Sequence, residues 1–447
     1  MTSTNLTAPE LLSPAGSLKH LHYAFAYGAD AIYAGQPRYS LRARNNEFKH
    51  DQLIEGIGEA RRQNKKFYVA SNLSPHNDKL RSYIRDMEPI IEMKPDALIM
   101  ADPGLIMMVR EKWPDMPVHL SVQANAVNWA TVKFWHQFGV SRVILSRELS
   151  IEEIQEIAER CPEVELEVFV HGALCIAYSG RCLLSGYMNH RDSNQGACTN
   201  ACRWKYDAHE AKETLEGNVV TEKPLVYQPT QEEAEPAHEK IFLLQEQNRP
   251  GEYMPAYEDE NGTYIMNSKD LRAVQHVETL TKMGVKSLKI EGRTKSHYYA
   301  ARTAQIYRQA IDDAVAGRGF NMSLMDQLEK LSNRGYTEGF YRRHPPKEFQ
   351  NYETGISRSD QQMFVGEIRD YSAEKNMITI DVKNRFQVGD VLELMTPQGN
   401  HFFKLDYLQS ERGEQRQDAP GSGHVVQIPL PFEMPMSSEY GLLMKSV

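Results

Sequence analysis

The chain has 447 residues, of which 41% are hydrophobic and 25% are charged. This composition lies in the ordinary globular range and excludes a disordered or fibrous protein. The sequence contains no apolar run of the roughly 18 residues that a membrane span needs and no basic and apolar N-terminal signal, so we expect a cytoplasmic protein without a membrane partner.

The acidity of the chain is concentrated in one segment. Residues 207–262 contain 14 Asp and Glu against 4 Lys and Arg, so they contribute −10 to the net charge of −9 and the rest sums to about +1. This segment is rich in Glu, Pro and Gln, which predicts an insertion outside the packed core. Basic residues gather in residues 38–50, 291–308 and 342–344. Such runs are usually solvated faces, and only their convergence in the fold would form an RNA-binding surface.

Over the first 290 residues, short apolar runs alternate with longer amphipathic segments, which is typical of β/α units around a parallel sheet. The predicted strands are residues 10–13, 29–33, 66–71, 97–101, 118–122, 142–145, 165–170 and 287–290. Predicted helices include residues 20–27 and 151–159, the second beginning after Ser150 with Glu153 in a capping box. Eight strands predict an α/β fold with a TIM-like (β/α)8 barrel, irregular where the acidic insertion separates the last two strands.

The pattern changes after the eighth strand. Residues 298–315 and 324–333 predict two helices, and from residue 363 short alternating strands with turns predict a small C-terminal β-barrel. We therefore expect a barrel domain over residues 1–345 with an insertion at about 207–262, a linker over residues 346–362 and a C-terminal domain over residues 363–447. Small β-barrels of this kind often bind RNA, and as often they are structural caps.

Polar residues occupy the positions where the predicted strands end, which is where TIM barrels carry their functional side chains. Amides and cations there suit an oxygen-rich anionic ligand, because Arg binds a carboxylate through two parallel hydrogen bonds. The candidate ligand-binding residues are Asn72, Gln123, Asn125, Arg147, Arg293 and Lys295, and the candidate catalytic residues are His171, Glu148 and Glu291. The alternative is that the pairs Arg147–Glu148 and Glu291–Arg293 are structural ion pairs.

Four of the five cysteines lie within 28 residues after the seventh strand, namely Cys175, Cys182, Cys198 and Cys202. A reducing compartment disfavours a disulfide framework. Six, fifteen and three residues separate these cysteines, and only the last spacing fits structural zinc, whereas iron-sulfur clusters tolerate wide spacing. The spacing thus favours a 4Fe-4S cluster over zinc, and a single nucleophilic cysteine with His171 as its base leaves three thiols unexplained. We expect the fifth, Cys161, to be structural.

Several familiar motifs are missing from the sequence. It contains no HExxH helix, no GxSxG elbow, no GxxxxGK[ST] loop and no dinucleotide-binding fingerprint. The residues therefore give no support for a hydrolase.

The stretch EVFVHGALCIAYSGRCLLS, residues 167–185, resembles the signature of the collagenase-like family of unassigned peptidases. The patterned positions are Glu167, Phe169, Gly172, Ala173, Cys175, Gly180, Cys182 and Ser185. Further stretches, from PELLSPAGSLKH near the start through NQGACTNACRW and SLKIEGRTKS to VGDVLELMTPQGN, resemble a branch of this family that modifies tRNA. The resemblance covers nearly the whole chain.

This resemblance implies prephenate-dependent, oxygen-independent formation of 5-hydroxyuridine at the wobble position of tRNA. It implies a 4Fe-4S cluster held by Cys175, Cys182, Cys198 and Cys202, prephenate as co-substrate, and the tRNA anticodon loop as partner. Arg147, Arg293 and Lys295 are then the candidate ligands of the prephenate carboxylates. A peptidase and a non-catalytic, metal-stabilised RNA-binding protein remain alternatives. Direct hydroxylation and a reaction that needs an electron-transfer partner both stay open, and the sequence does not indicate an oligomeric state.

Overall fold

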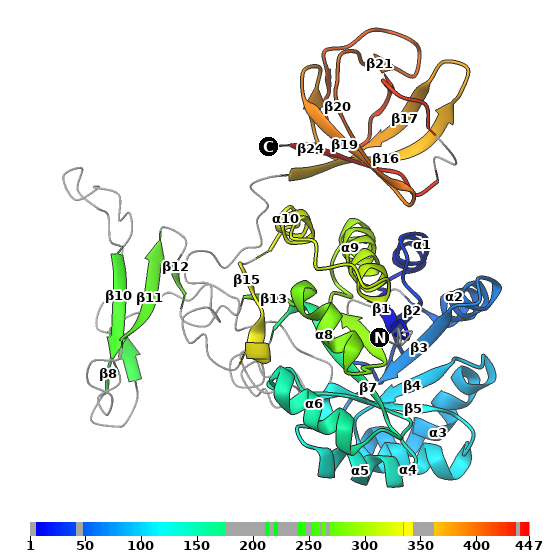
Figure 1. Cartoon of the computed structure of the whole chain (residues 1–447), viewed down its shortest axis with the longest axis vertical. Helices are drawn as coiled ribbons and strands as arrows, with labels where there is room; N and C mark the ends of the chain where they lie inside the picture. The colour runs from blue at the N-terminus through cyan, green and yellow to red at the C-terminus, as the bar shows by residue number, and fades with distance from the viewer. Residues whose placement is uncertain are drawn as a thin grey trace.

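The structure is a computed structural model of the chain (Figure 1). It describes residues 6–41, 48–174, 211–213, 219–221, 240–245, 253–259, 262–264, 269–333, 335–342, 362–434 and 439–446. No helix in these ranges is both long and apolar enough to span a bilayer. The predicted linker, apart from residue 362, lies outside the described residues.

Eight parallel strands form a closed barrel. They are β1 (Glu10–Pro14), β2 (Ala31–Gly35), β3 (Lys66–Ser71), β4 (Ala97–Met100), β5 (Val118–Leu120), β6 (Arg142–Ile144), β7 (Glu165–Ala173) and β14 (Ser287–Ile290). Each strand pairs with the next, and β14 closes the barrel because Ser287 is paired with both Glu10 of β1 and Glu167 of β7. The predicted TIM-like barrel is confirmed, and all eight predicted strands overlap the observed ones.

The barrel is irregular at the seam between β7 and β14. The register shifts between Lys289 and Ile290, where His171 becomes the partner of Ile290. Beyond that point the carboxyl end of β7 pairs with the antiparallel strand β13 (Asp270–Arg272), which in turn pairs with β15 (Tyr336–Thr337). The irregularity therefore lies where the sequence predicts it, after the seventh strand.

Helices surround the barrel (Figure 1). They are α1 (Leu18–Ala26), α2 (His50–Arg62), α3 (Asn77–Glu92), α4 (Pro103–Lys112), α5 (Trp129–Gln137), α6 (Ile151–Arg160), α8 (Val277–Lys282), α9 (His297–Val315) and α10 (Ser323–Glu329). The predicted capping box of α6 is present, since Glu153 N donates to Ser150 Oγ and Ser150 N donates to Glu153 Oε2 at 2.9 Å. The predicted helix over residues 324–333 is too long, because Asn333 accepts a hydrogen bond from Gly335 N in a turn that follows α10.

The acidic insertion contains strands that the sequence analysis does not predict. β8 (Ala211–Glu213) pairs with β9 (Val219–Thr221), and β10 (Lys240–Gln245), β11 (Tyr253–Asp259) and β12 (Gly262–Tyr264) form a second antiparallel sheet. They escape prediction because they are short and lie in a segment rich in Glu, Pro and Gln.

The C-terminal domain is an antiparallel β domain, as predicted. Its seven-stranded sheet has the order β20 (Gly399–Lys404), β19 (Val391–Thr396), β24 (Leu442–Ser446), β16 (Gln362–Ser372), β17 (Met377–Val382), β23 (Val425–Pro429) and β21 (Gln409–Ser410). A short pair, β18 (Phe386–Gln387) and β22 (Asp418–Ala419), accompanies it. The central strand β24 was not predicted, because Leu442, Leu443 and Met444 are all buried and show no alternation.

The C-terminal domain packs over α1, α9 and α10 of the barrel (Figure 1). Met395, Leu442 and Met444 join the hydrophobic core of the barrel. At the centre of this contact Arg302 of α9, which is fully buried, lies 2.8 Å from Glu393 of β19. Burial alone would raise the pKa of Glu393, but hydrogen bonds and attraction from Arg302 outweigh it and lower that pKa. The two domains thus share one core with an ion pair inside it.

We expect Arg302→Ala to lower the free energy of unfolding by about 3 kcal/mol, since it leaves a buried carboxylate without its main partner. Lys19→Ala is the matched control: it also removes an ion pair across the domain contact, to Glu367, but Lys19 is 44% exposed and the loss should stay under about 1 kcal/mol. Urea-induced unfolding measures both, and equal losses would contradict the central role of Arg302.

Candidate active site

A buried ion-pair network occupies the inside of the barrel. The Arg142 side chain is 1% exposed, and its Nη1 lies 2.6 Å from Glu10 Oε1 and 3.2 Å from Glu167 Oε2. Glu167 also accepts a hydrogen bond from Lys289 Nζ at 2.8 Å. These residues come from β1, β6, β7 and β14, so the network joins the strands on both sides of the closing seam.

The charges in this network are set by burial and by the neighbouring ions. Burial disfavours the charged form of Arg142, but Glu167 and Glu10 outweigh it and raise its pKa. Burial lowers the pKa of Lys289 more than Glu167 raises it. Lys289 is therefore the more easily deprotonated of the two cations, although the Glu167 carboxylate still favours its charged form.

Two aromatic rings connect this network to the mouth of the barrel, which is the end at which the carboxyl ends of the parallel strands lie. Lys289 Nζ lies 4.3 Å from the centroid of the Tyr33 ring and 5.5 Å from that of Phe169, so this cation contacts both rings. The guanidinium carbon of Arg147 lies 3.8 Å from the Phe169 centroid, and that of Arg293 lies 5.6 Å from the Tyr33 centroid. Each of the two predicted anion ligands thus lies over one of the two aromatic rings that contact Lys289, a favourable setting for cations.

Arg147 and Arg293 differ in their polar partners. Arg293 is buried and donates from Nη1 to Ser40 Oγ at 3.0 Å. Arg147 is half-buried and forms no ion pair with any residue that the structure describes. Glu148 Oε2 is buried and has no hydrogen-bond partner within the described ranges. No ion pair between Arg147 and Glu148 occurs among the described residues, so the structure gives no support for the alternative that this pair is structural.

Glu291 and Lys295 lie in the loop that follows β14. Glu291 Oε2 accepts a hydrogen bond from Tyr33 OH at 3.0 Å, which ties this carboxylate to the ring beside Arg293. Lys295 Nζ lies 5.7 Å from the centroid of the Tyr299 ring. The structure therefore places Glu291 at Tyr33, the ring over which Arg293 lies, and Lys295 against the first turn of α9.

The three predicted amide residues form one cluster at the ends of β3 and β5. Asn72 donates from Nδ2 to Gln123 Oε1 at 3.0 Å, and Asn125 donates from Nδ2 to the Gln123 carbonyl at 2.9 Å. Asn125 adopts the left-handed conformation, with φ at 54°, and its buried Oδ1 has no partner in the part of the chain described. This oxygen is an acceptor available to a ligand.

His171 is enclosed by tyrosines. It is 1% exposed, its Nδ1 lies 3.3 Å from Tyr307 OH, and the rings of Tyr299, Tyr307 and Tyr336 have centroids 5.4 to 5.8 Å away. Burial lowers the pKa of His171 to about 3, although the Asp270 carboxylate opposes the shift. His171 is therefore neutral at pH 7 and sealed from solvent by the described residues.

The cysteine prediction falls outside the described residues. Cys175, Cys182, Cys198 and Cys202 all lie outside the ranges that the structure describes, and Leu174, directly after β7, is the last described residue before them. Among the described residues no group of three or more His, Cys, Asp or Glu is arranged to hold a metal ion. Cys161 is described, and it is buried at the end of α6 as expected.

Sequence reasoning missed several residues of this site, notably Tyr33, Ser40, Phe169 and Lys289. The available signal was the two-residue period of a strand, which places Phe169 on the same inward face as Glu167.

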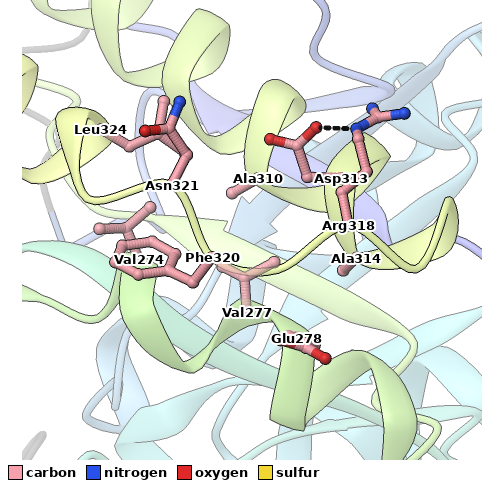
Figure 2. A pocket seen from close by; sticks show the side chains of 10 residues that line it. All are labelled: Val274, Val277, Glu278, Ala310, Asp313, Ala314, Arg318, Phe320, Asn321 and Leu324. Carbon is pink, nitrogen blue, oxygen red and sulfur yellow. Dashed lines mark hydrogen bonds and ion pairs between the residues drawn. The ribbon is translucent and has the colours of Figure 1, made fainter.

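A separate depression lies outside the barrel between α8, α9 and α10 (Figure 2). It is mainly apolar, with an ion pair of 2.6 Å between Asp313 and Arg318, and none of the predicted site residues lines it.

Comparison with known families identifies the chain. Residues 16–351 match the model of "Peptidase family U32", and residues 360–443 match that of "Peptidase family U32 C-terminal domain". The chain belongs to peptidase family U32. The resemblance seen in the sequence is therefore confirmed.

Proteins that are similar to the chain carry different names. tRNA hydroxylation protein P of Escherichia coli (strain K12) is 62% identical over 444 residues, which cover 98% of this chain and 97% of the relative. An uncharacterized protease of Methanocaldococcus jannaschii is 33% identical over 86% of both chains. The 23S rRNA 5-hydroxycytidine C2501 synthase of Escherichia coli is 29% identical over 74% of this chain and 42% of its own length.

The buried state of His171 predicts a pH dependence of stability. In the unfolded chain its pKa returns to 6.5, against about 3 in the folded state, so the unfolded state binds more protons between these values. The contribution of the neutral His171 ring to the free energy of unfolding is therefore complete above pH 6.5, and it is lost as the pH falls toward 3. We expect His171→Gln to reduce the slope of unfolding free energy against pH by about 1 kcal/mol per unit between pH 6.5 and 5. Equal slopes in denaturant titrations would contradict a buried neutral His171.

Proposed function

We propose that this chain is an enzyme that hydroxylates tRNA, forming 5-hydroxyuridine at the wobble position without molecular oxygen and with prephenate as co-substrate. The observation that carries the proposal is the 62% identity, over 98% of the chain, to a protein named for tRNA hydroxylation. The relative named as an rRNA 5-hydroxycytidine synthase supports the same class of chemistry, hydroxylation of a pyrimidine in RNA.

The charges at the mouth support an anionic co-substrate. Arg147 has no carboxylate partner among the described residues, and Arg293 lies over Tyr33, which shares the cation Lys289 with the Phe169 ring beneath Arg147. Prephenate carries two carboxylates, and each arginine can bind one of them through two hydrogen bonds. Glu148 Oε2, buried and without a partner in the described part of the chain, is the candidate proton acceptor beside this donor site.

The donor set of the cysteines fits an iron-sulfur cluster. β7 delivers the chain to the mouth, and Cys175 follows Leu174 directly in the sequence. Four thiolates suit a 4Fe-4S cluster, which supplies one-electron chemistry when bound. Zinc stays the alternative metal, and an electron-transfer partner stays part of the proposal.

The tRNA anticodon loop is the proposed partner. A wobble uridine has to leave its stack to reach the mouth, and aromatic faces and cations stabilise such an unstacked base. Arg147, which is half-buried and has no ion-pair partner among the described residues, provides a cation for this contact, whereas the rings of Tyr33 and Phe169 are almost fully buried.

A peptidase is the second candidate, favoured by the family name and by the protease-named relative. Such a site needs a base with access to a nucleophile. His171, the candidate base, is enclosed by three tyrosines, so the described geometry favours the hydroxylase.

The test is a nucleoside analysis of tRNA from cells in which the gene is deleted. We expect 5-hydroxyuridine to disappear and to return with the wild-type gene. A gene that encodes Arg147→Ala should restore less than about a tenth of the wild-type amount of 5-hydroxyuridine, because truncation of a buried charge contact costs about 2 kcal/mol or more. Arg160→Ala, which removes an exposed arginine paired with Glu156 on α6, is the control and should restore the full amount. Unchanged hydroxyuridine in the deletion strain would refute the function and leave a peptidase or a non-catalytic RNA-binding protein.

A further inference from the structure

The loop after β14, residues 291–296, carries Glu291, Arg293 and Lys295, and its backbone is held by side chains from several elements. Tyr33 OH of β2, whose one hydrogen is shared between two acceptors, lies 3.1 Å from the Ile290 carbonyl oxygen and 3.0 Å from Glu291 Oε2, and Tyr299 OH of α9 donates to the Glu291 carbonyl at 2.7 Å. Inside the loop, Lys295 N donates to the Gly292 carbonyl at 2.9 Å. The loop is thus fixed at its beginning and folded into a turn.

The far end of the loop is held by His20 of α1. Its Nε2 lies 2.8 Å from the Lys295 carbonyl oxygen, and its Nδ1 lies 2.7 Å from Ser17 Oγ. A carbonyl oxygen only accepts hydrogen bonds, so Nε2 carries the hydrogen and donates. In the neutral ring Nδ1 then accepts from the Ser17 hydroxyl, which sets the orientation of the imidazole.

Gly16 completes this contact. A Cβ atom at Gly16 would lie 2.4 Å from the Arg293 carbonyl oxygen, far inside van der Waals contact. Only glycine therefore allows the turn between β1 and α1 to approach the loop this closely. Gly16 and His20 meet the carbonyls of Arg293 and Lys295, the two cationic residues of the loop.

We propose that His20 is a positioning residue: it fixes the loop so that Arg293 and Lys295 are held in place at the mouth before the anionic co-substrate arrives. The kinetic part of this inference rests on the proposed function. A cation in a pre-ordered loop binds an anion more tightly, because the cost of ordering the loop is already met during folding. Loss of His20 should therefore weaken binding of the donor and leave the chemical step largely intact.

The experiment compares His20→Ala with His20→Gln, whose amide nitrogen can still donate to the Lys295 carbonyl. His22→Ala is the matched control, since it removes the same side chain two positions along α1, where the ring stacks on Tyr440 of the C-terminal domain. Ser17→Ala is a milder variant that keeps the imidazole and removes only its hydroxyl partner. The full-length proteins are measured by hydrogen exchange of peptides over residues 290–297 and by steady-state kinetics with tRNA and prephenate.

We expect His20→Ala to speed exchange in these peptides and to raise KM for prephenate about five- to thirty-fold, with kcat within about twofold of wild type. His20→Gln should recover most of the wild-type exchange rate and most of the wild-type KM. Ser17→Ala should give values between those of His20→Ala and wild type, and His22→Ala should match wild type. Unchanged exchange in His20→Ala and Ser17→Ala would overturn the proposal, as would a fall in kcat with unchanged KM. If wild type fails to hydroxylate tRNA, the proposed function fails, while the exchange measurement still decides whether His20 holds the loop.

Discussion

The barrel depends on one buried arginine. Arg142 is almost fully buried and bridges Glu10 of β1 and Glu167 of β7, while Lys289 of β14 binds the other oxygen of Glu167. Barrel interiors are usually filled by branched apolar side chains, which pack without any requirement for a partner. Here each charge requires its neighbour, because removal of one leaves another charge buried and unpaired. The closing seam and the polar mouth above it are therefore parts of one electrostatic arrangement.

The site and the domain contact are linked through α9. The loop with Arg293 and Lys295 leads directly into this helix, and two turns later Arg302 pairs with Glu393 of the C-terminal domain. α1 contacts both regions as well, since His20 holds the loop and Tyr27 OH lies 2.9 Å from the Tyr440 carbonyl. The C-terminal domain therefore supports the two helices that hold the cationic side of the mouth.

Much of this fold could be predicted from local sequence, and the failures have physical causes. Apolar runs placed all eight barrel strands, and strand ends placed Arg147 and Arg293. The central strand β24 was missed because burial on both faces removes the alternation that marks a strand.

The orientation of His171 could not be predicted from local sequence patterns. It depends on the register shift beside Ile290 and on Gly172, whose φ of 107° turns the chain where Glu291 approaches. Tyr33 and Lys289 gain their roles only from cross-barrel contacts.

We propose that a barrel bearing an iron-sulfur cluster uses prephenate to hydroxylate tRNA at this mouth. The most direct measurement is an anaerobic reaction of purified wild-type and Cys198→Ala proteins with tRNA from the deletion strain, with and without prephenate. Extract of that strain supplies any electron-transfer partner, and iron, sulfide and zinc are determined on the same samples. We expect 5-hydroxyuridine only with prephenate and only from wild-type protein that holds about four irons and four sulfides per chain. Product without prephenate, or full activity from a protein that holds zinc and no sulfide, would contradict it.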